Sequence, residues 1–137
     1  IKDLKIFLPS GTGTTALFLQ KFLPYEVLTV PCVGNKEYLK EQFLKLNKDE
    51  NKHPKILQPK KKYHFGKLYD EFYEIHKELL KETGIEFDFL YDSLGWQTLS
   101  ESSYFNKNNF LMYIHQGGLL GNKTMILRYN RRYKFKK

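Results

Sequence analysis

Apolar and polar positions along the first third of the chain predict strands and helices in alternation. Residues 4–8 form an apolar run, and residues 16–23 continue with the spacing of an amphipathic helix. Residues 26–33 are nearly all apolar and rich in β-branched side chains, as is typical of a buried strand. Residues 38–46 place apolar side chains at helical spacing and Lys and Glu on the other face. The chain therefore opens strand, helix, strand, helix.

The rest of the chain continues this alternation. We expect, in order, a short strand over residues 55–58, a helix over 67–83, an aromatic-rich strand or turn over 85–96 leading into a short helix over 96–102, a last buried strand over 110–115 and a helix over 119–129. The pattern predicts an α/β fold with an open, mainly parallel sheet and flanking helices. In such sheets, ligands bind beyond the carboxyl ends of the strands.

The junction between the first strand and the first helix is a candidate anion site. Its residues are Ser10, Gly11, Thr12, Gly13, Thr14 and Thr15. The glycines let the backbone approach a ligand, and the unpaired amides and dipole of a helix N-terminus favour an anion. The loop has no Gly-Lys-Ser/Thr sequence, so a phosphate monoester fits better than a nucleoside triphosphate. A turn that binds nothing remains the alternative.

Two further turns are expected at the same edge of the sheet. Tyr91 and Asp92 could reach one pocket, where the tyrosine could move a proton and the aspartate could keep a heteroaromatic nitrogen protonated. Alternatively, Asp92 caps a helix after an aromatic core residue. His115 ends the last predicted strand, and a structural, hydrogen-bonded histidine is the simpler interpretation. The four histidines and the single cysteine show no metal-ligand spacing, so no metal site is predicted.

Composition limits the class of protein. A chain of 137 residues with 41% apolar side chains suits one globular domain over residues 1–137. No apolar run is long enough to cross a bilayer, and the start does not have the pattern of a secretory signal, so no membrane partner is expected. Cys32 lies in an apolar strand and is expected to be a buried, inert thiol. A reducing cytoplasm is the expected compartment.

The net charge of +8 raises the question of nucleic acid as a partner. Basic residues cluster in residues 52–67 and again in residues 128–137. No nucleic-acid-binding motif accompanies them, so we favour a solvated lysine-rich surface. A basic α/β nucleic-acid-binding module is kept as the alternative from a different functional class.

Three separated segments, residues 8–16, 89–93 and 111–118, resemble one enzyme family in the right order. They are similar to the C-terminal part of 1-aminocyclopropane-1-carboxylate deaminases and D-cysteine desulfhydrases. These are pyridoxal 5'-phosphate enzymes of the tryptophan synthase β-like fold (fold type II). The resemblance implies a partial cofactor-binding domain and a parent enzyme that releases ammonia and a 2-oxo acid from a small amino acid.

The resemblance also implies roles for the candidate residues. The loop over residues 10–15 would hold the cofactor phosphate, and Tyr91 would lie near the substrate and exchange a proton. Asp92 stands where the deaminases have a glutamate facing the pyridine nitrogen, so the resemblance leans toward the deaminase branch. An acid at that place keeps the ring charged and the cofactor a strong electron sink.

The sequence departs from the family pattern at three places. Phe65 stands where the family has a second active-site tyrosine, and Ser93-Leu94 replaces the usual Gly-Lys. The Schiff-base lysine and the loop that binds the substrate carboxylate belong to the family's N-terminal half, and no lysine here matches that motif. We therefore expect a C-terminal portion that needs the N-terminal half of the same polypeptide, is inactive alone, and self-associates through exposed core faces.

Overall fold

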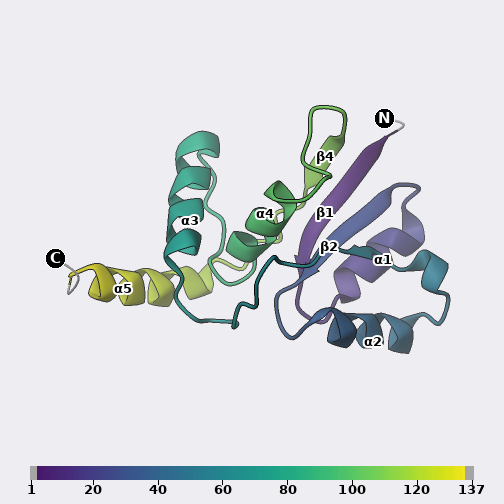
Figure 1. The fold of residues 1–137 in the computed structure, drawn as a ribbon, viewed down its shortest axis with the longest axis horizontal. Coiled ribbons are helices and arrows are strands. Elements are labelled where there is room, and N and C mark those ends of the chain that lie inside the picture. The colour runs from purple at the N-terminus through teal and green to yellow at the C-terminus, as the bar shows by residue number, and fades with distance from the viewer. Residues whose placement is uncertain (1–2, 135–137) are drawn as a thin grey trace.

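Strand β1 (Leu4–Ser10) is one of the two central strands of a four-stranded parallel sheet (Figure 1). The computed structural model describes residues 3–134. β1 pairs with β2 (Glu26–Pro31) on one side and with β4 (Phe110–Tyr113) on the other, and β3 (Lys55–Ile56) extends the sheet beyond β2. All pairings are parallel, so the loops that follow the strands meet at one edge.

The two faces of the sheet are covered by different helices. Side chains of successive strand residues point to opposite faces. Ile6 and Leu8 pack in one cluster with Ala16 of α1 (Thr14–Phe22), whereas Phe7 packs with Leu94 of α4 (Asp92–Ser100). The sheet is therefore the middle layer of an α/β arrangement.

Helix α4 approaches β1 closely because one of its residues is glycine. A Cβ built on Gly95 would lie 3.1 Å from Cβ of Pro9 and 3.2 Å from Oη of Tyr113. These contacts are tighter than ordinary van der Waals packing. The missing side chain thus fixes how α4, and the turn before it, sit over the end of β1.

The remaining helices lie at the periphery. α2 (Lys36–Leu46) covers α1, and a 3-10 turn, η1 (Glu50–Lys52), leads into β3. α3 (Asp70–Thr83) packs against α4, and α5 (Leu120–Lys134) extends away from the sheet (Figure 1). α5 is held by a separate apolar cluster that contains Phe89, Met125 and Tyr129.

The fold class predicted from the sequence is confirmed: the sheet is open and all-parallel with flanking helices. The bounds of several elements differ from those expected: α3 begins at Asp70 and not at residue 67, and α5 runs to Lys134 and not to residue 129. Two further differences have a physical reason. α4 begins at Asp92, four residues before the expected start, because residues 88–92 form a hydrogen-bonded turn at its N-terminus. β4 is an edge strand, so Phe110 and Met112 are exposed where a buried strand was expected.

Candidate functional site

The glycine–threonine loop, residues 10–15, joins the end of β1 to the start of α1. Gly13 is the N-cap of α1 and has a φ of 82°, a left-handed conformation that favours glycine. No side chain in the described part of the chain caps this helix. The first amides of α1 are therefore free to donate hydrogen bonds to an anion, in the field of the helix dipole.

The hydroxyl groups of this loop are not equivalent. Thr29 donates to the carbonyl of Leu8 at 2.7 Å, and its oxygen lies 2.5 Å from Oγ of the buried Ser10. Each hydroxyl has one proton, so Ser10 must donate to Thr29 and has none left for a ligand. Thr12 and Thr14, whose oxygens are 3.3 Å apart, keep more freedom. The hydroxyl groups of this loop that remain available to a ligand are therefore those of Thr12 and Thr14.

A cavity of about 570 Å³ opens beside the loop and brings together segments that are far apart in the sequence. All six loop residues line it, as do residues from the turn before α4 and from the loop after β4. The lining residues outside the loop are Pro9, Ala16, Val33, Tyr38, Asp88, Leu90, Tyr91, Gln116, Gly117 and Gly118. The three turns expected at one sheet edge do meet around one cavity, and the volume is in the range of small-molecule sites.

Tyr91 lies directly over the loop. A Cβ built on Gly11 would lie 3.5 Å from Oη of Tyr91, so the phenol and the loop backbone are neighbours. The ring of Phe65 is 5.3 Å from the ring of Tyr91. Burial, followed by the nearby Cys32 and Asp88, raises the pKa of Tyr91. The hydroxyl is therefore protonated at neutral pH and can donate into the cavity.

Asp92 faces the interior of the protein and is not among the cavity residues. It is 2% exposed; its Oδ1 accepts a 2.6 Å hydrogen bond from the hydroxyl of Tyr113, and its Oδ2 accepts one of 3.1 Å from the amide of Asp88. The ring of Tyr113 is held between Phe7 and Phe87. The carboxylate of Asp92 is therefore bonded within the fold. The helix-capping alternative is wrong, because the N-cap of α4 is Tyr91 and no side chain of the described residues makes a capping hydrogen bond there.

Asp88 is the acid that lines the cavity, and sequence reasoning missed it. Its Oδ1 accepts a 2.6 Å hydrogen bond from the amide of Tyr91, while Asp92 accepts from the amide of Asp88. These two hydrogen bonds hold the turn before α4. No local signal in the sequence shows that Asp88, and not Asp92, faces the cavity. Burial first, and then the adjacent Asp92, raises the pKa of Asp88 to about 7.

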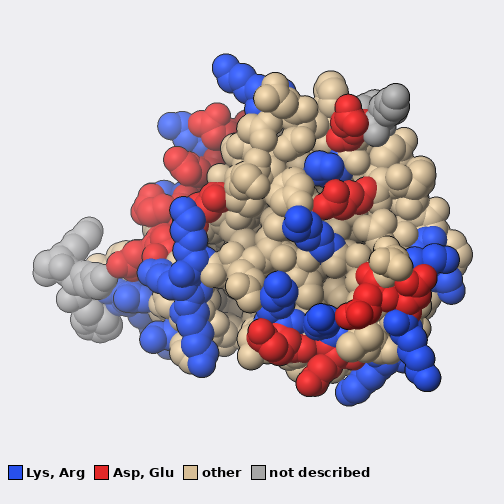
Figure 2. Space-filling view, turned by 45° about the vertical axis from the view of Figure 1, so that its right-hand side comes forward, with Lys and Arg blue, Asp and Glu red and all other residues tan. Residues whose placement is uncertain are grey.

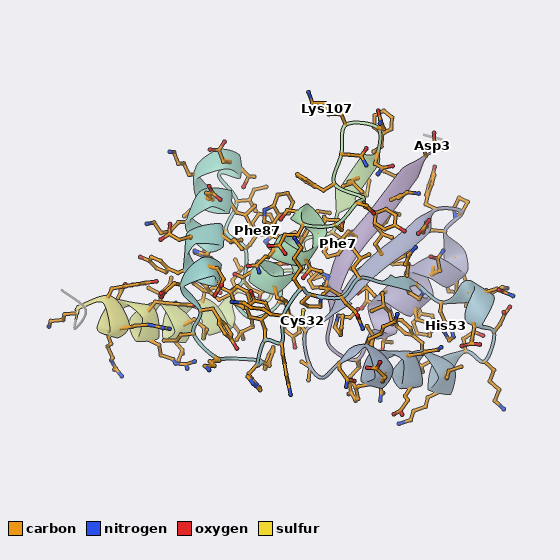
Figure 3. The ribbon with its side chains drawn as sticks, in the orientation of Figure 1. Asp3, Phe7, Cys32, His53, Phe87 and Lys107 are labelled. Atoms are coloured by element: carbon orange, nitrogen blue, oxygen red, sulfur yellow. The ribbon has the colours of Figure 1, made fainter. Side chains whose placement is uncertain are left out.

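Cys32 follows β2 near the centre of the molecule, where Figure 3 labels it. Burial above all raises the pKa of its thiol, with a further contribution from the charge of Asp88. The thiol lies 3.7 Å from the carbonyl of Tyr91. A buried, protonated thiol agrees with the inert role expected from the sequence.

The loop after β4 closes another side of the cavity. Gln116 donates to the carbonyl of Pro9 at 3.1 Å, which ties this loop to the end of β1. The amide of Gly117 donates to Nδ1 of His115, so Nε2 carries the proton that bonds to the carbonyl of Glu86 at 2.7 Å. His115 thus supports the loop from outside the cavity, as a structural histidine.

Other possible sites have less support in the described residues. Within residues 3–134, no three His, Cys, Asp or Glu side chains are grouped so that they could hold a metal ion. None of the helices there is both long and apolar enough to cross a membrane.

Two of the basic side chains of α5 form hydrogen bonds with backbone carbonyls elsewhere in the fold. Arg128 donates to the carbonyl of Gly66 at 2.7 Å and Arg132 to that of Leu68 at 3.1 Å. Basic and acidic side chains lie beside one another over the face in Figure 2. This arrangement suits a mixed, solvated surface.

Comparison with solved structures gives a match over almost the whole chain. The crystal structure of an ACC deaminase homologue superposes with a TM-score of 0.68 at 18% sequence identity, over 93% of this chain and 45% of that chain. The fold is that of part of an ACC deaminase homologue. At this level of identity the likeness concerns the fold, and the chain spans less than half the length of that protein. No profile of a known protein family and no curated protein matches the sequence.

Within this ACC deaminase-like fold, the structure assembles most of the candidates named from the sequence. Tyr91 and the glycine–threonine loop line one cavity, Phe65 packs on Tyr91, and Asp92 lies behind the cavity wall. Asp88 takes the place at the wall that Asp92 was expected to have. The arrangement can bind an anionic group at one end and present a phenol and a carboxyl group nearby.

Proposed function

We propose that the chain is the cofactor-phosphate-binding part of a pyridoxal-phosphate-dependent enzyme that acts on a small amino acid. The observation that carries the proposal is the uncapped N-terminus of α1, which opens into the same cavity as Tyr91 and Asp88. The ACC deaminase-like fold supports it.

The residues present fit a phosphorylated pyridine in chemistry and in space. The amides and threonine hydroxyls of the loop can bind a phosphate dianion, and Gly11 leaves the space between the loop backbone and Tyr91 open. Val33, Tyr38 and Leu90 offer apolar surface for a ring. When bound, pyridoxal phosphate supplies an electron sink for cleavage of bonds at the substrate α-carbon. Tyr91 would hold or move a proton at its Oη near that carbon.

The parent enzyme would be a deaminase or desulfhydrase that releases ammonia and a 2-oxo acid. None of the residues that line the cavity is a lysine. The lysine that binds the cofactor would therefore come from the N-terminal half of the same polypeptide. We expect no ammonia from the purified chain mixed with pyridoxal phosphate and either D-cysteine or 1-aminocyclopropane-1-carboxylate. Measurable turnover would contradict this division of roles.

A binding experiment tests the phosphate site directly. The probe is 4′-deoxypyridoxine 5′-phosphate, which has no aldehyde and cannot react with surface lysines. Gly11→Val should weaken its binding at least about tenfold in calorimetry, because the side chain would fill the space below Tyr91. Thr124→Ala, an exposed threonine on α5, is the matched control and should change nothing. Equal binding by both variants would refute the proposal.

A family member with altered chemistry is the second candidate, because of Phe65. Its ring packs against Tyr91 but has no hydroxyl. Where the family that the sequence resembles has two active-site tyrosines, this chain would have one. In the reconstituted parent enzyme, Phe65→Tyr should raise turnover of D-cysteine if proton exchange by a second phenol is what has been lost. An unchanged or lower rate would favour an enzyme built around Tyr91 alone.

A further inference from the structure

A second hollow lies beside the first, at the carboxyl ends of β2 and β3, and has a volume of about 660 Å³. Tyr38 lines both hollows. The basic side chains that line the second are those of Lys36 at the start of α2, and of Lys60, Lys61, Lys62 and His64 in the loop after β3. None of the described residues that line it is Asp or Glu. This hollow, the basic cleft, therefore concentrates positive charge in one place.

The two hollows offer an anion different chemistry. The described residues that line the first include no lysine, arginine or histidine, so its donors are neutral amides and hydroxyls. The basic cleft instead presents several ammonium groups around one space. Neutral donors at one helix N-terminus suit a single phosphate group, whereas several cations around one space suit a ligand that carries several negative charges.

The lysines of the basic cleft are available to a ligand. Within residues 3–134, Lys36 and Lys62 take part in no salt bridge. Lys60 lies 3.8 Å from Glu101, and Lys61 lies 3.1 Å from Glu71. Exposed ion pairs of this kind contribute little to stability, so a ligand with a higher charge can replace both acids.

The backbone adds to the field of the basic cleft. Gly34 and Asn35, which lead into α2, line the cleft, and the side chain of Asn35 accepts from the amide of Tyr38 at 2.8 Å. The two amides that precede Tyr38 on the first turn of α2 stay available as donors. The positive end of the helix dipole therefore acts together with the lysines.

We propose that the basic cleft binds an oligophosphate chain, either inorganic or that of a nucleoside triphosphate. This site is separate from the proposed cofactor-phosphate site and goes beyond the proposed function. The phosphate charges would pair with the four lysines, and the volume of the cleft is in the range of small-molecule sites. Phe65 also lines the cleft and is 47% exposed, so its ring is available to stack on a base.

Calorimetry with inorganic tripolyphosphate tests the site. The double variant Lys36→Ala/Lys62→Ala should bind it at least about tenfold more weakly, because two charge-assisted contacts are lost. Lys48→Ala/Lys81→Ala is the matched control, since it removes the same charge from two exposed positions that do not line the cleft. The control should change the affinity less than about twofold. Equal weakening by the two double variants would refute the site and indicate attraction by the net charge alone.

A competition experiment separates the basic cleft from the first cavity. Saturation of the chain with 4′-deoxypyridoxine 5′-phosphate should leave the affinity for tripolyphosphate unchanged within about twofold, since neither ligand needs the donors of the other. Displacement of one by the other would place tripolyphosphate on the glycine–threonine loop and overturn the proposal. If the phosphorylated pyridine does not bind but tripolyphosphate does, the proposed function fails and the basic cleft stands.

The two sources of the phosphate chain can be distinguished in the same assay. A nucleoside triphosphate should bind at least about threefold more tightly than inorganic tripolyphosphate, and Phe65→Ala should remove this gain, because the stacking surface is lost. Equal affinities for the two ligands would identify the phosphate chain alone as what the cleft recognises. Absence of binding by both would refute the proposal.

Discussion

The glycine–threonine loop and the turn over residues 86–92 form two walls of the same cavity, but they are specified in different ways. The loop depends mainly on its own residues: a strand ends, glycine takes a left-handed conformation and a helix begins. The turn depends on partners far along the chain. Its backbone forms hydrogen bonds with the side chain of Asn122 on α5, and the carboxylate of Asp92 accepts one from Tyr113 on β4. The conformation of the loop is therefore determined mainly by its local sequence, whereas that of the turn depends on tertiary contacts.

The largest effect is expected at Gly13, where backbone conformation and packing act together. A Cβ on this residue would lie 2.5 Å from Cε1 of Phe43 and 2.6 Å from Cδ1 of Leu39, both fully buried. Gly13→Ala should therefore lower the free energy of unfolding by about 2–5 kcal/mol in denaturant titrations.

Gly66 is the matched control for Gly13, since its φ is 79° and a Cβ there would meet nothing within 4 Å. Gly66→Ala should cost only about 1–2 kcal/mol, from backbone strain alone. Equal losses for the two variants would show that packing against α2 does not hold the loop.

The next effect concerns the turn and its partner on α5. Asn122 is 2% exposed; its side chain accepts from the amide of Phe89 and donates to the carbonyl of Phe87 and to Glu86. Asn122→Ala leaves buried polar groups unpaired and should therefore lower the free energy of unfolding by about 2–4 kcal/mol. Asn35→Ala, which removes only the local cap of α2, should cost about 1 kcal/mol. A smaller loss at Asn122 than at Asn35 would contradict the contrast between the two regions.

The acid pair in the turn predicts a pH dependence of stability. The pKa of Asp88 is raised to about 7 in the folded chain from 3.8, so the folded state binds more protons than the unfolded state between these values. The contribution of Asp88 to stability should therefore be greatest below pH 4, and it should be lost as the pH rises through about 7. The loss relative to Asp88→Asn should be about 2 kcal/mol between pH 5 and pH 7. A parallel pH dependence of the two proteins would refute the raised pKa.

The smallest effect tests the different roles of the loop hydroxyls. Ser10→Ala removes the buried hydrogen bond to Thr29 and should cost about 1 kcal/mol of stability, with phosphate binding little changed. Thr14→Ala should weaken phosphate binding and leave stability nearly unchanged. The reverse pattern, measured by calorimetry and denaturant titration, would show that Ser10 contacts the anion.

The sequence pattern predicts the sheet, its parallel strands and the loop, because hydrophobic periodicity and glycines at a strand–helix junction are local signals. It does not distinguish Asp88 from Asp92. Their directions depend on which of them meets Tyr113, a residue 21 positions after Asp92. Nor does it predict that Ser10 donates to Thr29, since that bond crosses two paired strands. Side-chain directions that depend on long-range partners are therefore what the sequence pattern could not predict, and the binding roles of all the site residues stay predictions.

Amide NMR tests whether the loop and the turn over residues 86–92 enclose one site for a phosphorylated ring. The labelled chain is titrated with 4′-deoxypyridoxine 5′-phosphate, and the residues whose amide resonances shift are mapped. We expect the largest shifts to fall together on residues 11–15 and 88–91, with the same affinity at both. Shifts confined to the basic helix α5, or separate affinities for the two walls, would contradict it.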